Sequence, residues 1–388
     1  MRVAIVVTHL LGAGHLRRAI NLAQAFSDAG HAATVISGGV PVSQFSTTVQ
    51  VQQLPALKSD GTNFSRLLTA DGTEVDSDYL TSRSKILCEI TEQFKPTVVI
   101  TELFPFGRRM LRKEFISLLD TLKNSSEPPL VIASVRDILA APSSDKKAKK
   151  THDLIDEYYA AVLVHSNSDV IELDRSWPVS SSLAPRLRYT GFVAQNTESN
   201  ASVVNREELP ENEILVSAGS GSVGRHVFEA AVQASALLKD QQWRVLVAGS
   251  DADEEIERLR ALCELHGVSD QVTIEPARAD FRELLRRCQC SVSLCGYNTV
   301  VDLLQSGTPG VFIPFDEGGE TEQTVRAQSL GRLPSYSVVK ASSLTPEQLA
   351  ASVREVCGAG RFDPEDNGFD GATQSVHIVQ SLLSDIGR

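Results

Sequence analysis

Cysteines, aromatic residues and long apolar runs are all scarce in this chain. It has 388 residues but only six cysteines, and these lack the paired CxxC spacing of zinc sites. They are also too few for a secreted scaffold held by disulfides, so we expect reduced, mostly buried thiols in a cytoplasmic protein. No uninterrupted apolar span is long enough to cross a bilayer, and the apolar start Met1–Leu10 indicates a first strand rather than a signal peptide.

Positive charge is also lacking. The formal net charge is −12, which argues against a nucleic-acid partner because a phosphate backbone requires a basic face. The one basic cluster, Asp145–Lys150, is expected to be a solvated loop, although contact with an anionic acceptor stays open. Metal-ligand spacing is absent except for Asp251-Ala-Asp253, which is better explained as a helix cap with an acidic first turn. We therefore expect no metal and no other cofactor.

The first half of the chain alternates strands with helices. An apolar strand, Val3–Val7, leads through the glycine loop Gly12-Ala-Gly14-His15 into a helical pattern, which is typical of a βαβ unit. The third glycine of the dinucleotide fingerprint GxGxxG is missing, so the loop gives a nicotinamide cofactor little support. Residues Val49–Tyr79 are polar and irregular, and we expect loops and short helices there. Further strands are predicted at His31–Ser37, Pro96–Glu102, Leu130–Asp137 and Ala161–His165.

The second half repeats this pattern. A strand at Glu213–Ser217, a glycine loop at Ala218–Gly224 and a helix at Arg225–Leu238 follow a polar stretch that is typical of a linker. We predict an α/β protein with two Rossmann-like domains, each a doubly wound parallel sheet, facing an interdomain cleft. The predicted boundaries are 1–193 for the first domain, 194–212 for the linker, 213–370 for the second domain, and 371–388 for a C-terminal helix that has the option of packing back on the first domain.

An anion site is predicted where the strand that ends before Cys295 meets the next helix. Gly296 provides a small-residue turn, and Asn298 is expected to cap the helix. The open backbone N–H groups of such a helix start attract phosphate groups. Asp302, one turn into the helix, is placed to bind hydroxyls of the same ligand, although an acid near a helix start is common without any ligand.

Two further stretches fit a phosphorylated sugar ligand. Glu322 and Gln323 carry a carboxylate and an amide, which form paired hydrogen bonds with sugar hydroxyls, but an exposed helix start is the better explanation of this pair taken alone. The loop Gly219-Ser220-Gly221-Ser222 is as compatible with a diphosphate contact as with a tight turn that requires glycine.

Three residues of the first domain are candidates for a general base. His15 follows the first glycine loop at the ligand-binding edge of the predicted sheet, where a helix start keeps an imidazole neutral and able to accept a proton. Glu102 and Asp137, each at the end of a strand, are rivals for this role. Three arginines in the same half are free either to bind an anionic acceptor or to pair with these acids: Arg108, Arg109 and Arg136.

Several of these motifs occur together in one enzyme family. They are Gly12–His15, Ala218–Ser222, and Gly296-Tyr-Asn-Thr followed by Asp302, Gly307-Thr-Pro309 and Glu322-Gln323. This set resembles the GT-B glycosyltransferases, in particular family 28 enzymes of the MurG type and a group of predicted bacterial glycosyltransferases. The latter group also has stretches similar to Thr101–Arg109, Ser134–Ile138 and Tyr189–Val193. The resemblance covers nearly the whole chain and implies the GT-B architecture.

Carried over by position, the resemblance implies a role for each matching residue. Gly219, Ser220 and Gly221 would hold the donor diphosphate, and Asp302, where the family usually has glutamate, would hold the ribose at a reach shorter by one methylene. The pair Glu322-Gln323 would contact the donor sugar, and His15 would lie near the acceptor hydroxyl. The other expected donor-side residues are Ser222, Gly296, Asn298 and Thr299, and the other acceptor-side residues are Gly12 and Gly14.

The predicted function is therefore a cytoplasmic, metal-independent glycosyltransferase. It would move a sugar with inversion from a UDP-, dTDP- or GDP-linked donor to a hydroxyl of a small-molecule, glycan or lipid-linked acceptor. Peripheral membrane contact is compatible with such an acceptor. Two alternatives share the fold and the donor site: a nucleotide-sugar 2-epimerase, and a non-catalytic nucleotide-sugar-binding protein.

Overall fold

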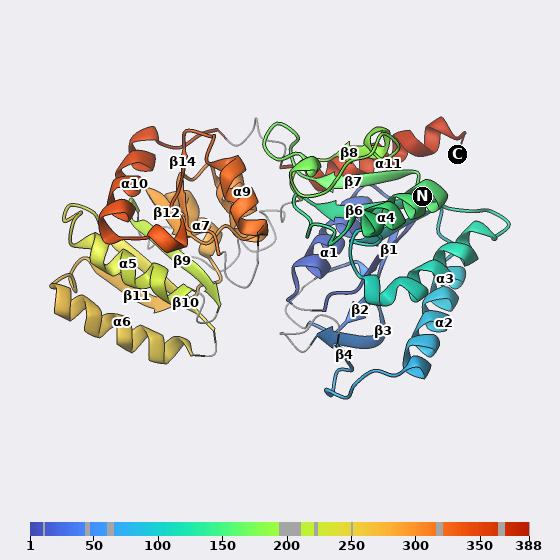
Figure 1. Ribbon diagram of the computed structural model, residues 1–388, viewed down its shortest axis with the longest axis horizontal. Coiled ribbons are helices and arrows are strands. Elements are labelled where there is room, and N and C mark those ends of the chain that lie inside the picture. The colour runs from blue at the N-terminus through green and yellow to red at the C-terminus, as the bar shows by residue number, and fades with distance from the viewer. Residues whose placement is uncertain are drawn as a thin grey trace. The chain divides into compact units, whose positions relative to one another are not determined.

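The chain forms two compact units (Figure 1). A computed structural model describes residues 1–10, 12–42, 47–59, 66–193, 211–220, 224–249, 251–315, 321–363 and 369–387. The first unit contains Met1–Gln195 together with Asp370–Arg388, and the second contains Asn196–Phe369. Each unit has its own sheet and its own buried core.

The first unit is built on an eight-stranded sheet in the order β4-β3-β2-β1-β5-β6-β7-β8. Neighbouring strands are parallel except β3 and β4, which are antiparallel. The central strands are almost wholly apolar and buried because helices cover both faces. The strands are β1 (Arg2–Val7), β2 (Ala32–Gly39), β3 (Gln50–Ser59), β4 (Leu67–Leu68), β5 (Val98–Glu102), β6 (Leu130–Arg136), β7 (Ala161–His165) and β8 (Leu187–Tyr189).

Helices α2, α3 and α4 pack on one face of this sheet, and α1 and α11 pack on the other. The last helix of the chain therefore belongs to the first unit. Val376, Val379 and Leu383 of α11 share a core with Leu16 and Phe26 of α1. The helices are α1 (Gly14–Asp28), α2 (Ser77–Phe94), α3 (Arg112–Lys123), α4 (Asp145–Tyr158) and α11 (Gly371–Asp385).

The second unit has a six-stranded parallel sheet in the order β11-β10-β9-β12-β13-β14. Its strands are β9 (Ile214–Ser220), β10 (Trp243–Ala248), β11 (Val272–Pro276), β12 (Cys290–Ser293), β13 (Gly310–Phe312) and β14 (Tyr336–Val338). Its helices are α5 (Arg225–Ser235), α6 (Ala252–His266), α7 (Phe281–Arg287), α8 (Tyr297–Ser306), α9 (Glu322–Leu330) and α10 (Pro346–Ala359). None of the helices within the described ranges has the length and apolar character needed to span a bilayer.

Both sheets are doubly wound around their first strand. The chain adds strands on one side of β1 or β9 and then returns to add strands on the other side. The order reverses between β1 and β5 in the first sheet and between β9 and β12 in the second. In such sheets the loops at the carboxyl ends of these strands diverge and leave a crevice in which ligands bind. Most of the predicted site residues lie at the ends of β1, β5, β9 and β12 or just after them, while Arg136 and Asp137 lie at the end of β6 and Glu322 and Gln323 follow β13.

Two local predictions are wrong. Val49–Tyr79 was expected to be irregular, but it contains the ten-residue strand β3, which pairs with β2 in parallel. The polar residues of β3 are tolerated because this strand lies towards the sheet edge, and its burial rises only near its end. The basic cluster Asp145–Lys150 is the first part of α4 rather than a loop, and Ala148 and Thr151 face the core while the lysines face solvent.

The cysteines are mostly buried, as predicted. Cys263, Cys288, Cys290 and Cys295 are buried, and Cys88 and Cys357 are partly exposed.

Candidate active site

His15 and Glu102 form the centre of the site in the first unit. His15 is the second residue of α1 and Glu102 is the last residue of β5, so they meet where the strand order reverses. The Nδ1 atom of His15 lies 2.8 Å from Oε1 of Glu102. Arg18, three residues further along α1, forms an ion pair with the same carboxylate. Arg18 was not predicted, although its i+3 spacing from His15 places both side chains on one face of the helix.

Burial and charge together set the protonation of this pair. Loss of solvent lowers the pKa of His15 to about 4, although the hydrogen bond and the charge of Glu102 oppose that shift. For Glu102 burial favours the neutral acid, but the charge of Arg18 and the hydrogen bond from His15 outweigh it and hold the pKa well below its ordinary value. Near pH 7 the site therefore contains a neutral imidazole beside an ionised carboxylate.

The proton of neutral His15 is on Nδ1. An ionised Glu102 has no hydrogen to donate, so a separation of 2.8 Å requires an N–H group on the imidazole side. Nη2 of Arg18 also lies 3.0 Å from Nδ1, but it already donates to the same Oε1 of Glu102, so Nδ1 need not accept from it. The other ring nitrogen, Nε2, then carries a lone pair, and it has no hydrogen-bond partner among the described residues. The His15 side chain is 15% exposed. This nitrogen is free to accept a proton from a ligand.

The two rival bases are enclosed. Glu102 is 1% exposed, and its oxygens are used by His15, Arg18 and Ser134. Asp137 is fully buried, and its Oδ1 accepts a hydrogen bond from the backbone N–H of Ile138 at 2.8 Å. Neither carboxylate presents a free face to solvent, whereas His15 does.

The predicted arginines differ in their surroundings. Arg108 is half-buried, and its Nε atom is buried without a hydrogen-bond partner in the described part of the chain. Burial lowers the pKa of Arg108 to about 10, with Glu102 raising it and Arg136 lowering it further. Arg136 is also half-buried and donates through Nε to the carbonyl oxygen of Ile138 at 3.1 Å. Arg109 is exposed.

The glycine loop before α1 shapes the approach to His15. Gly12 has φ +63°, a left-handed conformation that a side chain disfavours, and Gly14 is the first residue of α1. Ala13, the N-cap of α1, makes no side-chain hydrogen bond to the helix start. The first N–H groups of α1 are therefore not capped by a side chain.

In the second unit, β9 ends in the glycine loop that was predicted to hold a diphosphate. Gly219 and Ser220 are the last residues of β9, while Gly221 and Ser222 lie outside the described residues. A Cβ atom on Gly224 would come within 2.3 Å of the Ala218 side chain, so glycine permits the close approach of the α5 start to the strand. Helix α5 also begins without a side-chain cap.

The helix start at α8 differs from the prediction in one respect. The N-cap is Gly296 rather than Asn298, and Gly296 has no side chain that could cap the helix. Asn298 and Thr299 lie in the first turn, where Asn298 is exposed. Gly296 has φ −70° and ψ 148°, and a Cβ atom there would meet nothing within 4 Å, so the fold does not require glycine at this position. A small residue here leaves the first N–H groups of α8 open to a ligand.

Asp302 is held by an arginine from the preceding helix. Nε of Arg282 on α7 lies 2.8 Å from Oδ1 of Asp302, which is 14% exposed. The pairing was not predicted because Arg282 precedes Asp302 by twenty positions on another element. A carboxylate has about four lone-pair sites, which is more than one ion pair uses.

Arg326 links the two turns that carry the other donor-side residues. This fully buried guanidinium donates to the carbonyl oxygen of Cys295 at 2.8 Å and pairs with Glu322 at 2.8 Å. Gln323 accepts a hydrogen bond from the backbone N–H of Phe315 at 3.2 Å. The turn after β12 is thereby tied to the start of α9, and sequence analysis did not find Arg326.

The Asp251-Ala-Asp253 motif behaves as a helix start. Asp251 is the N-cap of α6 without a side-chain cap bond, and Asp253 is in an acidic first turn. Arg225 lies 3.4 Å from Asp251. Within the described residues no group of three or more His, Cys, Asp or Glu side chains is arranged to hold a metal ion.

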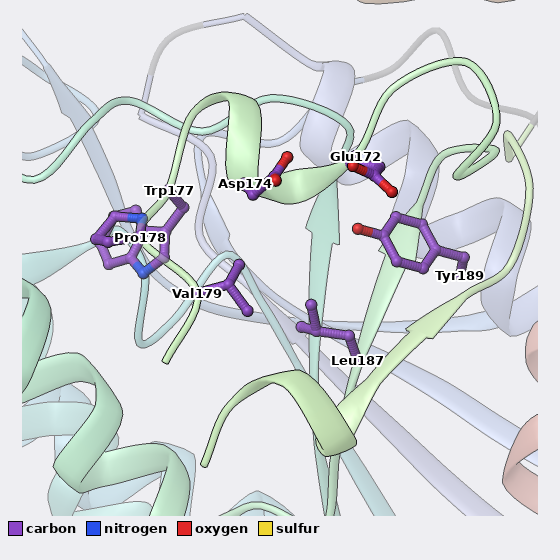
Figure 2. Close-up of a pocket in the computed structure, with 7 residues that line it drawn as sticks. All are labelled: Glu172, Asp174, Trp177, Pro178, Val179, Leu187 and Tyr189. Carbon is purple, nitrogen blue, oxygen red and sulfur yellow. The ribbon is translucent and has the colours of Figure 1, made fainter. Parts of the chain in front are cut away.

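A pocket of about 470 Å³ lies beside β8 in the first unit and contains none of the predicted site residues (Figure 2). Figure 2 shows the Tyr189 hydroxyl directed towards Glu172, above Val179 and Leu187. That hydroxyl accepts a hydrogen bond from the backbone N–H of Leu173 at 2.9 Å. The pocket is distinct from the His15 site.

The sequence of the second unit matches a known family of domains. Residues 214–365 match the family model described as Glycosyltransferase family 28 C-terminal domain, a range that includes β9 and α8. A UDP-N-acetylglucosamine--N-acetylmuramyl-(pentapeptide) pyrophosphoryl-undecaprenol N-acetylglucosamine transferase from Rhodospirillum rubrum is 30% identical over 138 residues. That stretch covers 35% of this chain and 35% of the relative, so the chain matches about a third of the relative's length.

Solved structures extend the likeness to the whole chain. MurG of Acinetobacter baumannii superposes with a TM-score of 0.60 at 14% identity, covering 99% of this chain and 100% of that one. UGT2 of Phytolacca americana, solved in complex with UDP-2fluoro-glucose and pterostilbene, gives a TM-score of 0.65 at 13% identity and covers 100% of both chains. At such identities the likeness establishes the fold alone.

Proposed function

We propose that this chain, which has the GT-B fold and matches the C-terminal domain of glycosyltransferase family 28 over residues 214–365, transfers a sugar from a nucleotide-diphosphate sugar to an acceptor hydroxyl. The proposed reaction inverts the anomeric carbon and uses no metal ion. The observation that carries the proposal is the pairing of His15 with Glu102, which leaves a neutral imidazole nitrogen free where the strand order of the first sheet reverses.

The donor is proposed to bind at the reversal point of the second sheet. The uncapped starts of α5 and α8 offer backbone N–H groups and a positive dipole end to a diphosphate. Asp302, fixed by Arg282, is proposed to accept hydrogen bonds from the ribose, and Glu322 with Gln323 to contact the sugar. Relatives named as UDP-N-acetylglucosamine-dependent transferases make UDP the first nucleotide to test.

His15 is proposed to act as the general base. Its Nε2 takes the proton of the acceptor hydroxyl while the acceptor oxygen forms a bond to the anomeric carbon and the bond to the diphosphate breaks. The positive charge that develops on His15 is stabilised by Glu102 through the Nδ1–H hydrogen bond. The departing diphosphate takes the negative charge, which the helix starts of the donor site stabilise.

An anionic group on the acceptor would suit the surroundings of His15. Arg108 and Arg136 lie near Glu102, and the buried Nε of Arg108 has no protein partner among the described residues. An unsatisfied buried donor costs about 1–3 kcal/mol, which a carboxylate or phosphate oxygen would recover. Acceptors that carry such a group should therefore be included among the first compounds tried.

Nucleotide binding and donor turnover together test the proposal. Calorimetry with UDP, dTDP and GDP, with and without magnesium, should show binding of at least one nucleotide. Incubation with UDP-N-acetylglucosamine and an acceptor panel should release UDP, and His15→Gln should abolish release while binding UDP as the unmodified protein does. Absence of nucleotide binding would overturn the proposal. Conversion of the donor without acceptor would indicate an epimerase, and binding without turnover a non-catalytic protein.

A further inference from the structure

A chain of buried polar side chains continues behind Glu102. Ser134 Oγ lies 2.6 Å from Oε2 of Glu102 and 2.9 Å from Nε2 of His165. Nδ1 of His165 lies 2.9 Å from Oγ1 of Thr190. Ser134 and His165 are fully buried and Thr190 is 3% exposed. Strands β5, β6 and β7 and the residue that follows β8 each contribute one member, and the general-base mechanism uses only Glu102.

The ionised carboxylate fixes the direction of every hydrogen bond in this chain. Glu102 can only accept, so the single hydroxyl proton of Ser134 is donated to it. Ser134 must then accept from His165, which places the His165 proton on Nε2. Nδ1 of His165 is left as an acceptor, and Thr190 donates to it.

Competing arrangements are less favourable. Thr190 Oγ1 also lies 2.7 Å from the carbonyl oxygen of Gly191 and 3.4 Å from that of Val164, and it gives up these hydrogen bonds when it donates to His165. Donating to Gly191 instead would require a proton on Nδ1 of His165. The lone pair of His165 Nε2 would then face the oxygen lone pairs of Ser134 at 2.9 Å. Protonating both nitrogens of His165 is also disfavoured, because burial lowers its pKa to about 3.

We propose that Ser134, His165 and Thr190 are positioning residues that hold Glu102 in the orientation that keeps the His15 proton on Nδ1. Their effect on catalysis rests on the proposed function of His15. The proton order, meaning which atom carries each proton from His15 to Thr190, does not depend on that function. Ser134 donates a hydrogen bond to Oε2, the second carboxylate oxygen of Glu102. His165, oriented by Thr190, donates to Ser134 and so directs the Ser134 proton towards Glu102. Without them Glu102 is held by Arg18 and His15 alone, and Arg18, which contacts both carboxylate oxygens and lies 3.0 Å from Nδ1 of His15, competes with His15 for Oε1. The proton of His15 can then move to Nε2, which is no longer able to accept a proton from the acceptor hydroxyl.

Nitrogen NMR of the imidazole rings tests the proton order without any substrate. Protein with ring-labelled histidine is recorded at pH 7, and His15 and His165 are assigned from the His15→Gln and His165→Gln variants. The expected result is a proton on Nδ1 of His15 and on Nε2 of His165. A proton on Nδ1 of His165 in the unmodified protein would overturn the proposal, whatever activity is measured.

A matched pair of variants at Thr190 separates positioning from packing. Thr190→Val keeps the shape and removes the hydroxyl, whereas Thr190→Ser keeps the hydroxyl. Thr190→Val should shift the His165 tautomer and lower kcat roughly 10-fold with little change in KM, as is typical when a residue behind a reactive histidine is lost. Thr190→Ser should behave like the unmodified protein. Equal behaviour of the two variants in both measurements would contradict the proposal.

Ser134→Ala gives an independent check on the link nearest to Glu102. It should shift the His15 ring signals away from the pure Nδ1–H form and lower kcat by about 10–100-fold while UDP affinity is retained. An unchanged His15 tautomer in this variant would remove Ser134 from the positioning role. If the tautomers are as expected but no donor is turned over by the unmodified protein, the glycosyltransferase function fails and the proton order stands.

Discussion

The guanidinium of Arg326 donates to the carbonyl oxygen of Cys295 and pairs with Glu322, each at 2.8 Å, although these two partners lie on different turns of the second unit. Its side chain is fully buried and lies 5.8 Å from the ring centre of Tyr297. A single cation therefore fixes the turn before α8 relative to the start of α9. Both turns carry residues of the proposed donor site.

Arg326→Met should loosen these turns and weaken nucleotide binding. Loss of charge-assisted hydrogen bonds of this kind costs about 1.5–3 kcal/mol each. The chain has two tryptophans, Trp177 in the first unit and Trp243 in the second, so fluorescence in a Trp177→Phe background reports urea unfolding of the second unit. Arg332→Met, at an exposed position beyond α9, is the control and should leave the transition unchanged. A transition unaltered by Arg326→Met would contradict the structural role.

Stability should fall as the pH drops from about 6.5 towards 4. The folded pKa of His15 is about 4 and the unfolded value is about 6.5, so the unfolded chain binds a proton that the folded chain excludes in this interval. The stabilisation that comes from keeping His15 neutral is thus fully present above pH 6.5. By pH 5 the free energy of unfolding should be lower by roughly 2 kcal/mol. Urea midpoints at pH 7 and pH 5 measure it, and His15→Gln should reduce the difference. An equal pH dependence in the variant would exclude this origin.

Glu102→Gln should reduce turnover far more than nucleotide affinity. The neutral amide no longer stabilises a positive imidazole, and a general base contributes typically 10²–10⁴-fold, so we expect kcat to fall by about that factor. UDP affinity, which depends on the second unit, should change little. Glu114→Gln is a control for burial, because Glu114 also forms a buried ion pair, with Arg83, but does not contact His15. Similar losses of turnover in both variants would indicate a general folding defect instead.

Gly296→Ala should fold normally and bind nucleotide poorly. The backbone angles at Gly296 suit any residue, and an added Cβ would meet no protein atom within 4 Å, so stability is expected to change little. A diphosphate approaching the first N–H groups of α8 would meet the added methyl, and we expect UDP affinity to fall about 10-fold or more. Gly358→Ala, which also has free space around its Cβ, serves as the control. Full UDP affinity in Gly296→Ala would move the diphosphate away from α8.

Asp302→Asn should weaken binding of nucleotides that carry a ribose. The substitution removes the charge that pairs with Arg282 and halves the acceptor capacity offered to the hydroxyls. Losing a hydrogen bond to a charged group costs about 1.5–3 kcal/mol, so calorimetry should show UDP affinity falling roughly 10–100-fold. Inorganic diphosphate, which has no ribose, should bind both proteins alike. A uniform loss for both ligands would argue against a ribose contact.

Sequence patterns were sufficient for the strands that form the centre of each sheet. The apolar runs of β1, β5 and β7 are buried on both faces, and this environment selects continuous Val, Ile and Ala residues that are easy to recognise. Strand β3 escaped detection because it lies near the sheet edge and is only partly buried, so polar residues such as Gln52 and Gln53 are accepted there.

The site was predicted as separate residues rather than as a connected arrangement. His15 and Glu102 were both named, but as competitors, because nothing in the sequence shows that residues 87 positions apart are in contact. Arg282 was missed for the same reason, since Asp302 lies on another helix. The hydrogen bond of Arg326 to the carbonyl oxygen of Cys295 likewise joins two separate elements. Asn298 was given the cap position from residue type alone, whereas the chain geometry assigns it to Gly296.

The return of α11 to the first unit has a practical consequence for dissecting the protein. In topological terms the second unit is an insertion within the first, and the antiparallel bridge between Val193 and Asp370 brings the two ends of the insertion together. A chain cut after residue 195 would lack Val376, Val379 and Leu383, and the apolar residues of α1 that share a core with them would be exposed. A deletion that replaces 196–369 by a short connector keeps that face covered and is the natural route to the first unit on its own.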